Sequence, residues 1–375
     1  MAAPSKTATK KPRFDHEILL LQGGGALGAY HAGVYEALAE AGRIPNWVVG
    51  VSIGAITSAL IVGNAPERRV ERLREFWDRV SSYAPVTWPA WLDPMRPALN
   101  FLSAGAVAAF GSPGFFSPRT GSPFLAESGS PEATSIYDTT PLRQTLEELV
   151  DFDRINHRDV RISLGAVNVR TGASVYFDNH KIRIGPEHVM ASGALPPGFP
   201  AVEIDGEHYW DGGIVSNTPL TYVVDERPLT SALFIQVDLF KASGDLPANL
   251  DEVLERHKDI QYSSKQRFNA DRIKDLAGMW GAMGRLLTKL PAGLKSDPDA
   301  KLLAARHDDR EWTVARLINK RLKYVSQTKD YEFSRTTVNE HWAAGLDDVR
   351  RFVAGFESMH AQEIGPGVRI YDALD

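Results

Sequence analysis

Two glycine-rich turns near the start of the chain constrain its fold more than any other feature. The first, residues 23–28, follows the apolar run 17–22, and the second, residues 50–54, follows the β-branched run 47–51. Each turn is followed by an apolar stretch with helical spacing. Strand, tight turn and helix, repeated in this order, are typical of a parallel sheet with helices on its faces. We therefore expect an α/β fold.

The second turn has the sequence Gly-Val-Ser-Ile-Gly and places Ser52 between a strand and a helix. This is the arrangement of a nucleophile elbow, a strained turn that exposes a serine hydroxyl. Gly50 and Gly54 let the strand and the helix approach closely. The helix that begins at Ile53 presents its positive end to developing negative charge. Ser52 is the candidate nucleophile, and a buried turn with an idle serine is the alternative.

The first turn, Gly-Gly-Gly-Ala-Leu-Gly, also fits a dinucleotide-binding loop. Such a loop requires an Asp or Glu about 20 residues further on, at the end of the second strand, to bind a ribose. No acidic residue occurs between Arg43 and Pro66, and Ser52 occupies the position in question. The glycine cluster therefore favours a loop of backbone amides that binds an oxyanion.

A proton acceptor for Ser52 is expected at Asp211, in the stretch Tyr-Trp-Asp-Gly-Gly. Gly212 and Gly213 allow the backbone to turn sharply after the carboxylate. A free aspartate, with a pKa of about 3.9, is a poor base for a hydroxyl. Burial beneath an apolar substrate raises that pKa and makes Asp211 a better base. The Asp-Gly pair is also common in turns that have no catalytic role.

Four segments together resemble the patatin-like phospholipase family: the glycine cluster 23–28, the elbow 50–54, the stretch 191–200 (Ala-Ser-Gly-Ala-Leu-Pro-Pro-Gly-Phe-Pro) and the Asp-Gly-Gly triplet 211–213. They occur in the family's order over about 190 residues. The resemblance implies a catalytic dyad without histidine, with Ser52 as nucleophile and Asp211 as base. It implies hydrolysis of a lipid carboxylic ester, of the phospholipase A, lysophospholipase or lipase type, through an acyl-enzyme.

The resemblance also implies an oxyanion hole formed by backbone amides. The candidates are the glycine cluster and the residue after the nucleophile: Gly23, Gly24, Gly25, Ala26, Gly28 and Ile53. Many members of the family carry Arg or Lys before the last glycine of the cluster, whereas this chain has Leu27. The departure leaves the electrostatics of the loop and the preferred substrate open.

Two other functions remain as alternatives. A Ser–His–Asp esterase requires a histidine, but none of the ten histidines stands in a motif, and only His31 and His208 lie near the candidate site in sequence. The second alternative is an inactive hydrolase fold that binds lipid or serves as a scaffold, which the presence of both Ser52 and Asp211 disfavours.

Composition shifts divide the chain into four parts. We expect a disordered basic tail (1–16), a catalytic domain (17–240) and a C-terminal extension (241–375), with a proline- and aromatic-rich insertion at 83–140. The insertion either caps the elbow and supplies an acyl-chain pocket or a membrane-docking face, or is an ordinary subdomain. The expected fold is a three-layer α/β/α patatin-like fold with a mainly parallel central sheet, plus a largely helical C-terminal extension.

The extension itself carries motifs to which no chemistry can be assigned from the sequence. Residues 329–335 (Lys-Asp-Tyr-Glu-Phe-Ser-Arg) and 340–345 (Glu-His-Trp-Ala-Ala-Gly) resemble the extension of a bacterial branch of the family, whose function is unknown.

Charge and composition exclude several partners. The net charge of −5 gives no reason to expect nucleic-acid binding. The chain has no cysteine, which excludes disulfides and thiol catalysis. No apolar run is long enough for a membrane span, and no histidine pair or acidic cluster has metal-ligand spacing. We expect a cytoplasmic enzyme without metal or cofactor that acts on a lipid ester and touches membranes peripherally; no oligomeric state follows.

Overall fold

The computed structural model describes residues 14–81, 94–226, 231–306, 311–320, 326–359 and 367–372. Residues 1–13, most of the predicted tail, lie outside the described ranges, as do Trp88 and Trp91 of the insertion. Phe14 is buried and the first strand begins at His16, so the last residues of the predicted tail belong to the folded structure.

A nine-stranded sheet forms the centre of the described structure. Its strands are β1 (His16–Leu21), β2 (Trp47–Val51), β5 (Arg161–Asn168), β6 (Ser174–Asp178), β7 (Val202–Ile204), β8 (Glu207–Asp211), β9 (Ser231–Asp238), β10 (Glu311–Ile318) and β11 (Gly367–Asp372). The order is β11-β10-β9-β1-β2-β5-β8-β7, with β6 also paired to β5. Pairs from β11 to β5 are parallel, and those of β6, β7 and β8 are antiparallel.

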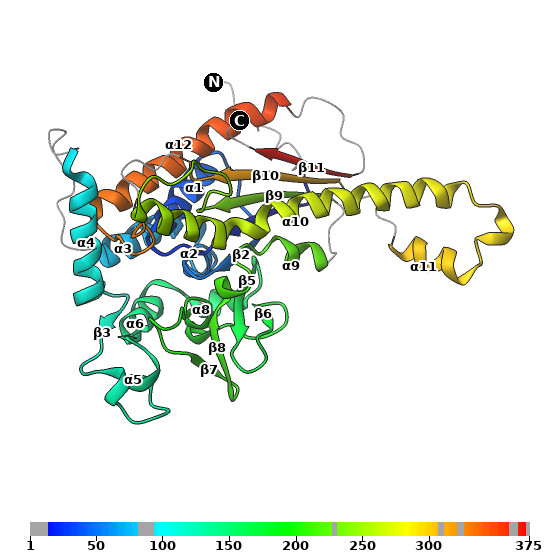
Figure 1. Ribbon diagram of the computed structural model, residues 1–375. Helices are drawn as coiled ribbons and strands as arrows, with labels where there is room; N and C mark the ends of the chain where they lie inside the picture. Colours follow the sequence, from blue (N-terminus) through cyan, green and yellow to red (C-terminus); the bar gives the residue numbers. More distant parts are fainter. Residues whose placement is uncertain are drawn as a thin grey trace, which may run out of the picture.

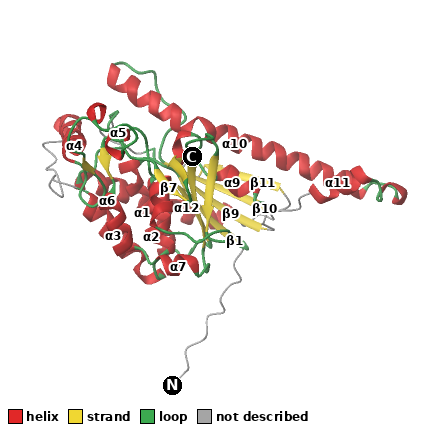
Figure 2. Ribbon diagram, turned by 90° about the horizontal axis from the view of Figure 1, so that it is seen from below, coloured by secondary structure: helices red, strands yellow, loops and turns green. Residues whose placement is uncertain are grey.

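Helices cover both faces of the sheet (Figures 1 and 2). One face carries α1 (Ala29–Glu40), α2 (Ile53–Val62), α3 (Arg69–Val80) and α12 (Arg335–Met359), and the other α9 (Leu220–Asp225) and α10 (Leu250–Thr288). β1 shows why: Leu19 and Leu21 join the first core, whereas Ile18 and Leu20 join the second. The predicted mainly parallel central sheet with helices on both sides is confirmed.

Apart from those of the insertion, the other helices surround the antiparallel end of the sheet or project from it. They are α6 (Thr140–Leu149), α7 (Phe152–Asn156), α8 (Pro186–Ser192) and α11 (Pro298–Arg306). α10 extends beyond the sheet. α11 lies near the outer end of α10, away from the body of the molecule (Figure 1). No helix in the described ranges combines the length and the apolar character that crossing a bilayer requires.

The insertion packs against the body as a small layer. It contains α4 (Arg96–Phe110), α5 (Pro131–Thr134) and the short strands β3 (Ser117–Pro118) and β4 (Tyr137–Asp138). Its Phe115 and Phe116 are buried and contact each other edge to face, with ring centroids 5.4 Å apart.

The C-terminal extension contributes strands as well as helices. β10 pairs with β9 in parallel along its whole length, and β11 pairs with β10. α12 packs along α1. The sequence analysis anticipated the helices but neither strand. Because β10 and β11 are strands of the central sheet, the extension is part of that sheet and not a separate helical appendage.

Candidate active site

The turn after β2 has the backbone of a nucleophile elbow. Ser52 has φ 57° and ψ −125°, a positive-φ backbone conformation that residues other than glycine rarely adopt. A Cβ atom on Gly50 would lie 2.2 Å from the Gly54 carbonyl oxygen, and one on Gly54 would lie 2.3 Å from the Leu21 carbonyl oxygen. Only glycine fits this approach of strand and helix, which holds Ser52 at the N-terminus of α2.

β5 brings the ends of β2 and β8 together. β2 runs parallel to β5 and pairs Val51 with Gly165, whereas β8 runs antiparallel to β5 and pairs Asp211 with Ala166. Ala166 also pairs with β6 on its other edge. β2 and β8 therefore share one edge of β5 and meet end to end. Because Ser52 directly follows Val51, the register of the sheet places it beside Asp211.

Asp211 is a buried carboxylate, with 2% of its surface exposed. The Gly213 amide donates to its Oδ1 at 2.7 Å, and the Ser52 hydroxyl lies close enough to interact with the carboxylate. Burial raises the pKa of Asp211 to about 6, and the interactions with Ser52 and the Gly213 amide oppose this shift because they favour the charged form. Such a group is ionised at neutral pH and is a stronger base than an exposed aspartate.

The glycine loop offers fewer free amides than the sequence analysis anticipated. The Gly23 amide donates to Asn217 Oδ1 at 3.1 Å, and the Ala26 amide donates to the Asp330 carbonyl at 2.8 Å. Gly28, at the end of the short 3₁₀ turn Gly25–Gly28, does not line the pocket.

Three of the predicted donors therefore remain. Among the described residues, the amides of Gly24, Gly25 and Ile53 have no hydrogen-bond partner, and all three residues line the same pocket as Ser52. The predicted set of Gly23, Gly24, Gly25, Ala26, Gly28 and Ile53 was too wide, because long-range contacts already use two of its amides.

Two polar side chains that the sequence analysis did not select hold the turns. Asn217 also donates from Nδ2 to the Gly23 carbonyl at 3.0 Å. Ser192 Oγ accepts from the Ser52 amide at 3.0 Å and donates to the Gly165 carbonyl at 2.5 Å. Both contacts join residues far apart in the chain, so no local pattern predicts them. Ser192 does lie in the 191–200 stretch that carried the family resemblance.

An apolar pocket of about 400 Å³ adjoins Ser52 and Asp211. Its walls come from the glycine loop, the elbow, the insertion, the 193–199 turn and the extension. The hydrophobic and aromatic wall residues are Ile53, Ile56, Val107, Ala108, Phe115, Phe116, Tyr137, Leu195, Pro196, Pro197, Phe199, Phe240, Tyr262, Tyr331 and Phe333. Leu27, the position at which this chain departs from the basic residue expected from the resemblance, is fully buried and is not part of the wall.

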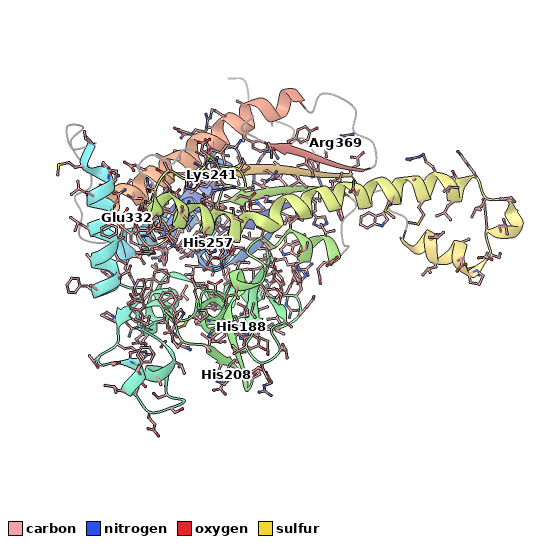
Figure 3. All side chains as sticks on the ribbon, in the orientation of Figure 1. His188, His208, Lys241, His257, Glu332 and Arg369 are labelled. Atoms are coloured by element: carbon pink, nitrogen blue, oxygen red, sulfur yellow. The ribbon has the colours of Figure 1, made fainter. Side chains whose placement is uncertain are left out.

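No histidine is among the described residues that line the pocket. His31 is fully buried in α1, where burial lowers its pKa to about 3. His208 is exposed at the outer part of the β7–β8 hairpin, and His188 lies on α8 (Figure 3). The described ranges also contain no group of three or more side chains that could hold a metal ion.

Comparison with known proteins identifies the family to which the chain belongs. A model described as "Patatin-like phospholipase" matches residues 19–224, and one described as "Patatin phospholipase" matches residues 260–363. No curated protein matches.

The solved structures that resemble the chain include VipD and ExoU. VipD from Legionella pneumophila is 16% identical with a TM-score of 0.35, over 89% of this chain and 67% of VipD. The type III effector ExoU is 14% identical with a TM-score of 0.28, over 88% of this chain and 53%, about half, of ExoU. Because the first family model covers more than half of the sequence and includes both turns and Asp211, the chain belongs to the patatin-like phospholipase family.

Proposed function

We propose that this protein is a serine acyl hydrolase of lipid carboxylic esters that uses Ser52 and Asp211 as a catalytic dyad. One observation carries the proposal: a serine in a strained elbow lies beside a buried aspartate of raised pKa, and both line an apolar pocket. Family membership supports the same reaction class.

The reaction proceeds through an acyl-enzyme. Asp211 takes the proton of the Ser52 hydroxyl as Ser52 Oγ attacks the ester carbonyl carbon. The free amides of Gly24, Gly25 and Ile53 stabilise the oxyanion, aided by the N-terminus of α2. Asp211 returns the proton to the leaving alcohol. It then accepts a proton from water, which attacks the acyl-enzyme, and the fatty acid leaves as Ser52 regains its proton.

The pocket and its surroundings suit an acyl chain better than a polar substrate. The insertion, the 193–199 turn and the extension each contribute aromatic rings to its wall. The insertion also exposes large apolar side chains: Phe110, two residues beyond the wall residue Ala108, is 75% exposed, and Phe124 and Leu125 are 96% and 88% exposed. Apolar side chains this exposed favour contact with a lipid surface.

Substitution of the dyad tests the proposal. Ser52→Ala and Asp211→Asn should each lower the turnover of a soluble short-chain ester by a factor on the order of 1,000. The double variant should lose no more than the worse single variant, because the two residues act as one unit. Ser122→Ala, which changes an exposed serine outside the pocket, is the matched control and should keep full activity.

A fluorophosphonate probe identifies the nucleophile independently of the natural substrate. The adduct should map to Ser52 and be absent from Ser52→Ala. An adduct on another serine would assign the chemistry elsewhere. A folded protein that takes no label and hydrolyses no ester would favour the inactive lipid-binding alternative.

A further inference from the structure

A short segment of the extension lies directly on the glycine loop. The Ala26 amide donates to the Asp330 carbonyl at 2.8 Å. A Cβ atom on Gly25 would lie 2.0 Å from that same oxygen, and Gly25 has φ +55°, so no other residue fits beneath the segment. Asp330, Tyr331 and Phe333 also line the pocket. The 326–334 segment is thus in contact with the loop whose neighbouring amides, at Gly24 and Gly25, are free.

Three ion pairs with α10 hold this segment at the contact residue Asp330 and at the preceding Lys329. Lys329 is buried, and its Nζ lies 2.7 Å from Asp259 Oδ1 and 3.1 Å from Glu255 Oε1. Lys258 of α10 donates to the Asp330 carboxylate at 2.6 Å. A buried ammonium without its carboxylate partners is costly, and so the segment is held firmly where Lys329 meets α10.

The other end of the segment is anchored to the insertion and the core. Ser103 of α4 donates to Glu332 Oε1 at 2.6 Å, and Figure 3 shows Glu332 beside α4. The Phe333 ring lies 5.7 Å from that of Phe115 and 6.4 Å from that of Trp77, centroid to centroid. Three separate parts of the molecule therefore determine where the Asp330 carbonyl lies.

The glycine loop is then held from two sides. On the catalytic-domain side, Asn217 makes two hydrogen bonds to Gly23. On the extension side, the Asp330 carbonyl holds Ala26. Gly24 and Gly25 lie between these two anchors, and their amides are the ones without partners among the described residues.

We propose that the 326–334 segment is a positioning element for the oxyanion hole, and that Lys329 is the positioning residue that keeps it in place. The inference rests on the proposed function, since it assigns a role to those amides in ester hydrolysis. It gives the extension a part in catalysis: the segment sets the conformation of the loop without touching the reacting atoms.

Lys329→Met, in the full-length chain, tests this. Its kcat for a soluble short-chain ester should fall about ten-fold or more, with KM little changed, because an oxyanion hole binds the transition state more than the substrate. Lys329→Arg should restore most of the kcat, since it keeps the charge. Arg350→Met is the matched control: its ion pair with Glu40 joins the extension to α1, both side chains are about half exposed, and neither residue lines the pocket.

Two further readouts separate positioning from loss of fold. Titration with a fluorophosphonate, carried to completion, should count a full complement of Ser52 in Lys329→Met. Hydrogen exchange of residues 24–28 should be faster in Lys329→Met than in the wild type and unchanged in Arg350→Met. If Lys329→Met does not fold, Lys258→Met, which breaks the more exposed Lys258–Asp330 pair, replaces it with the same expectations.

The outcomes are distinct from those that test the dyad. Unchanged kcat per titrated site, or unchanged exchange at 24–28, would overturn the positioning role even if the dyad is active. The exchange measurement does not require activity. A wild type without esterase activity would refute the proposed function, whereas faster exchange at residues 24–28 in Lys329→Met would still show that Lys329 holds the loop in place.

Discussion

At the scale of single residues, the chemistry of the site depends on how little water reaches Asp211. Burial raises the pKa of Asp211 to about 6. Only the carboxylate can accept the proton of Ser52, so activity should be full well above this pKa and lost below it. We expect kcat/KM for a soluble ester to rise through a single limb near pH 6 and then stay level to pH 8. A limb near pH 4 would show that Asp211 is solvated in the free enzyme.

The same burial makes Asp211 unfavourable for stability. Because its pKa is raised above the unfolded value of about 3.9, the folded state binds its proton more tightly. The stability from this difference is complete below about pH 4 and is lost as the pH rises through about 6. Asp211→Asn removes the charge but keeps an oxygen to accept from Ser52 and Gly213.

The inactive Asp211→Asn protein should therefore melt at a higher temperature than the wild type at pH 8. The difference should shrink towards zero at pH 4, where Asp211 is protonated. Melting of both proteins at the two pH values measures this, and other titrating groups cancel in the comparison. An equal difference at both pH values would contradict the assignment.

The residues of the site differ in how far the sequence could reveal them. Ser52 and Asp211 stand in motifs whose chemistry is local: a strained turn and an Asp-Gly-Gly bend. Asn217 and Ser192 act through hydrogen bonds to residues 194 and 140 positions away, which only the assembled sheet creates. For the same reason, the sequence could not show that Ala26 is already bound by the Asp330 carbonyl.

At the scale of elements, the sequence revealed the first half of the sheet better than the last part. The strand expected at residues 47–51 is β2, with the same bounds, because a short β-branched run between turn residues is a strong local pattern. β10 was missed. Arg316 interrupts its apolar pattern, and that charge is tolerated only because Asp372 and Asp238 lie 3.1 and 3.7 Å away.

The contact between α1 and α12 is a second feature that only packing explains. A Cβ atom on Gly345 would lie 2.2 Å from the Tyr30 carbonyl oxygen, and one on Gly33 would lie 1.9 Å from the Trp342 carbonyl oxygen. Gly278 in α10 has open space around it. The helices of the catalytic domain and the extension thus approach each other backbone to backbone.

Substitution of these glycines should separate packing from helix propensity. Gly345→Ala should lower the free energy of unfolding by about 1–3 kcal/mol, because overpacking outweighs the gain in propensity. Gly278→Ala should raise it by up to about 1 kcal/mol, because only the propensity gain applies. Urea titrations that compare midpoints at equal slope measure both. If the urea midpoints of both variants shift in the same direction, α1 and α12 do not approach each other as closely as described.

At the scale of the whole molecule, the family boundaries and the fold do not coincide. The first family model ends at residue 224, and the second begins at residue 260. The sheet continues across that gap, since β9, β10 and β11 are consecutive neighbours. The pocket also draws Tyr262, Tyr331 and Phe333 from beyond residue 240. We propose that the catalytic domain (17–240) and the extension (241–375) are one folding unit.

A chain ending at residue 240 should therefore fail to fold. It would leave β9 as an unpaired edge whose Phe234 and Ile235 are fully buried in the intact protein, and would uncover the face of α1 that α12 covers. We expect it to be insoluble, or to lack near-ultraviolet circular dichroism and a cooperative melt. As a control, a Gly/Ser stretch of equal length in place of residues 292–306 removes α11, which lies far from the sheet (Figure 1), and should leave the melt cooperative. A soluble, cooperatively melting 1–240 chain would show instead that the extension is a separate unit added to a complete catalytic domain.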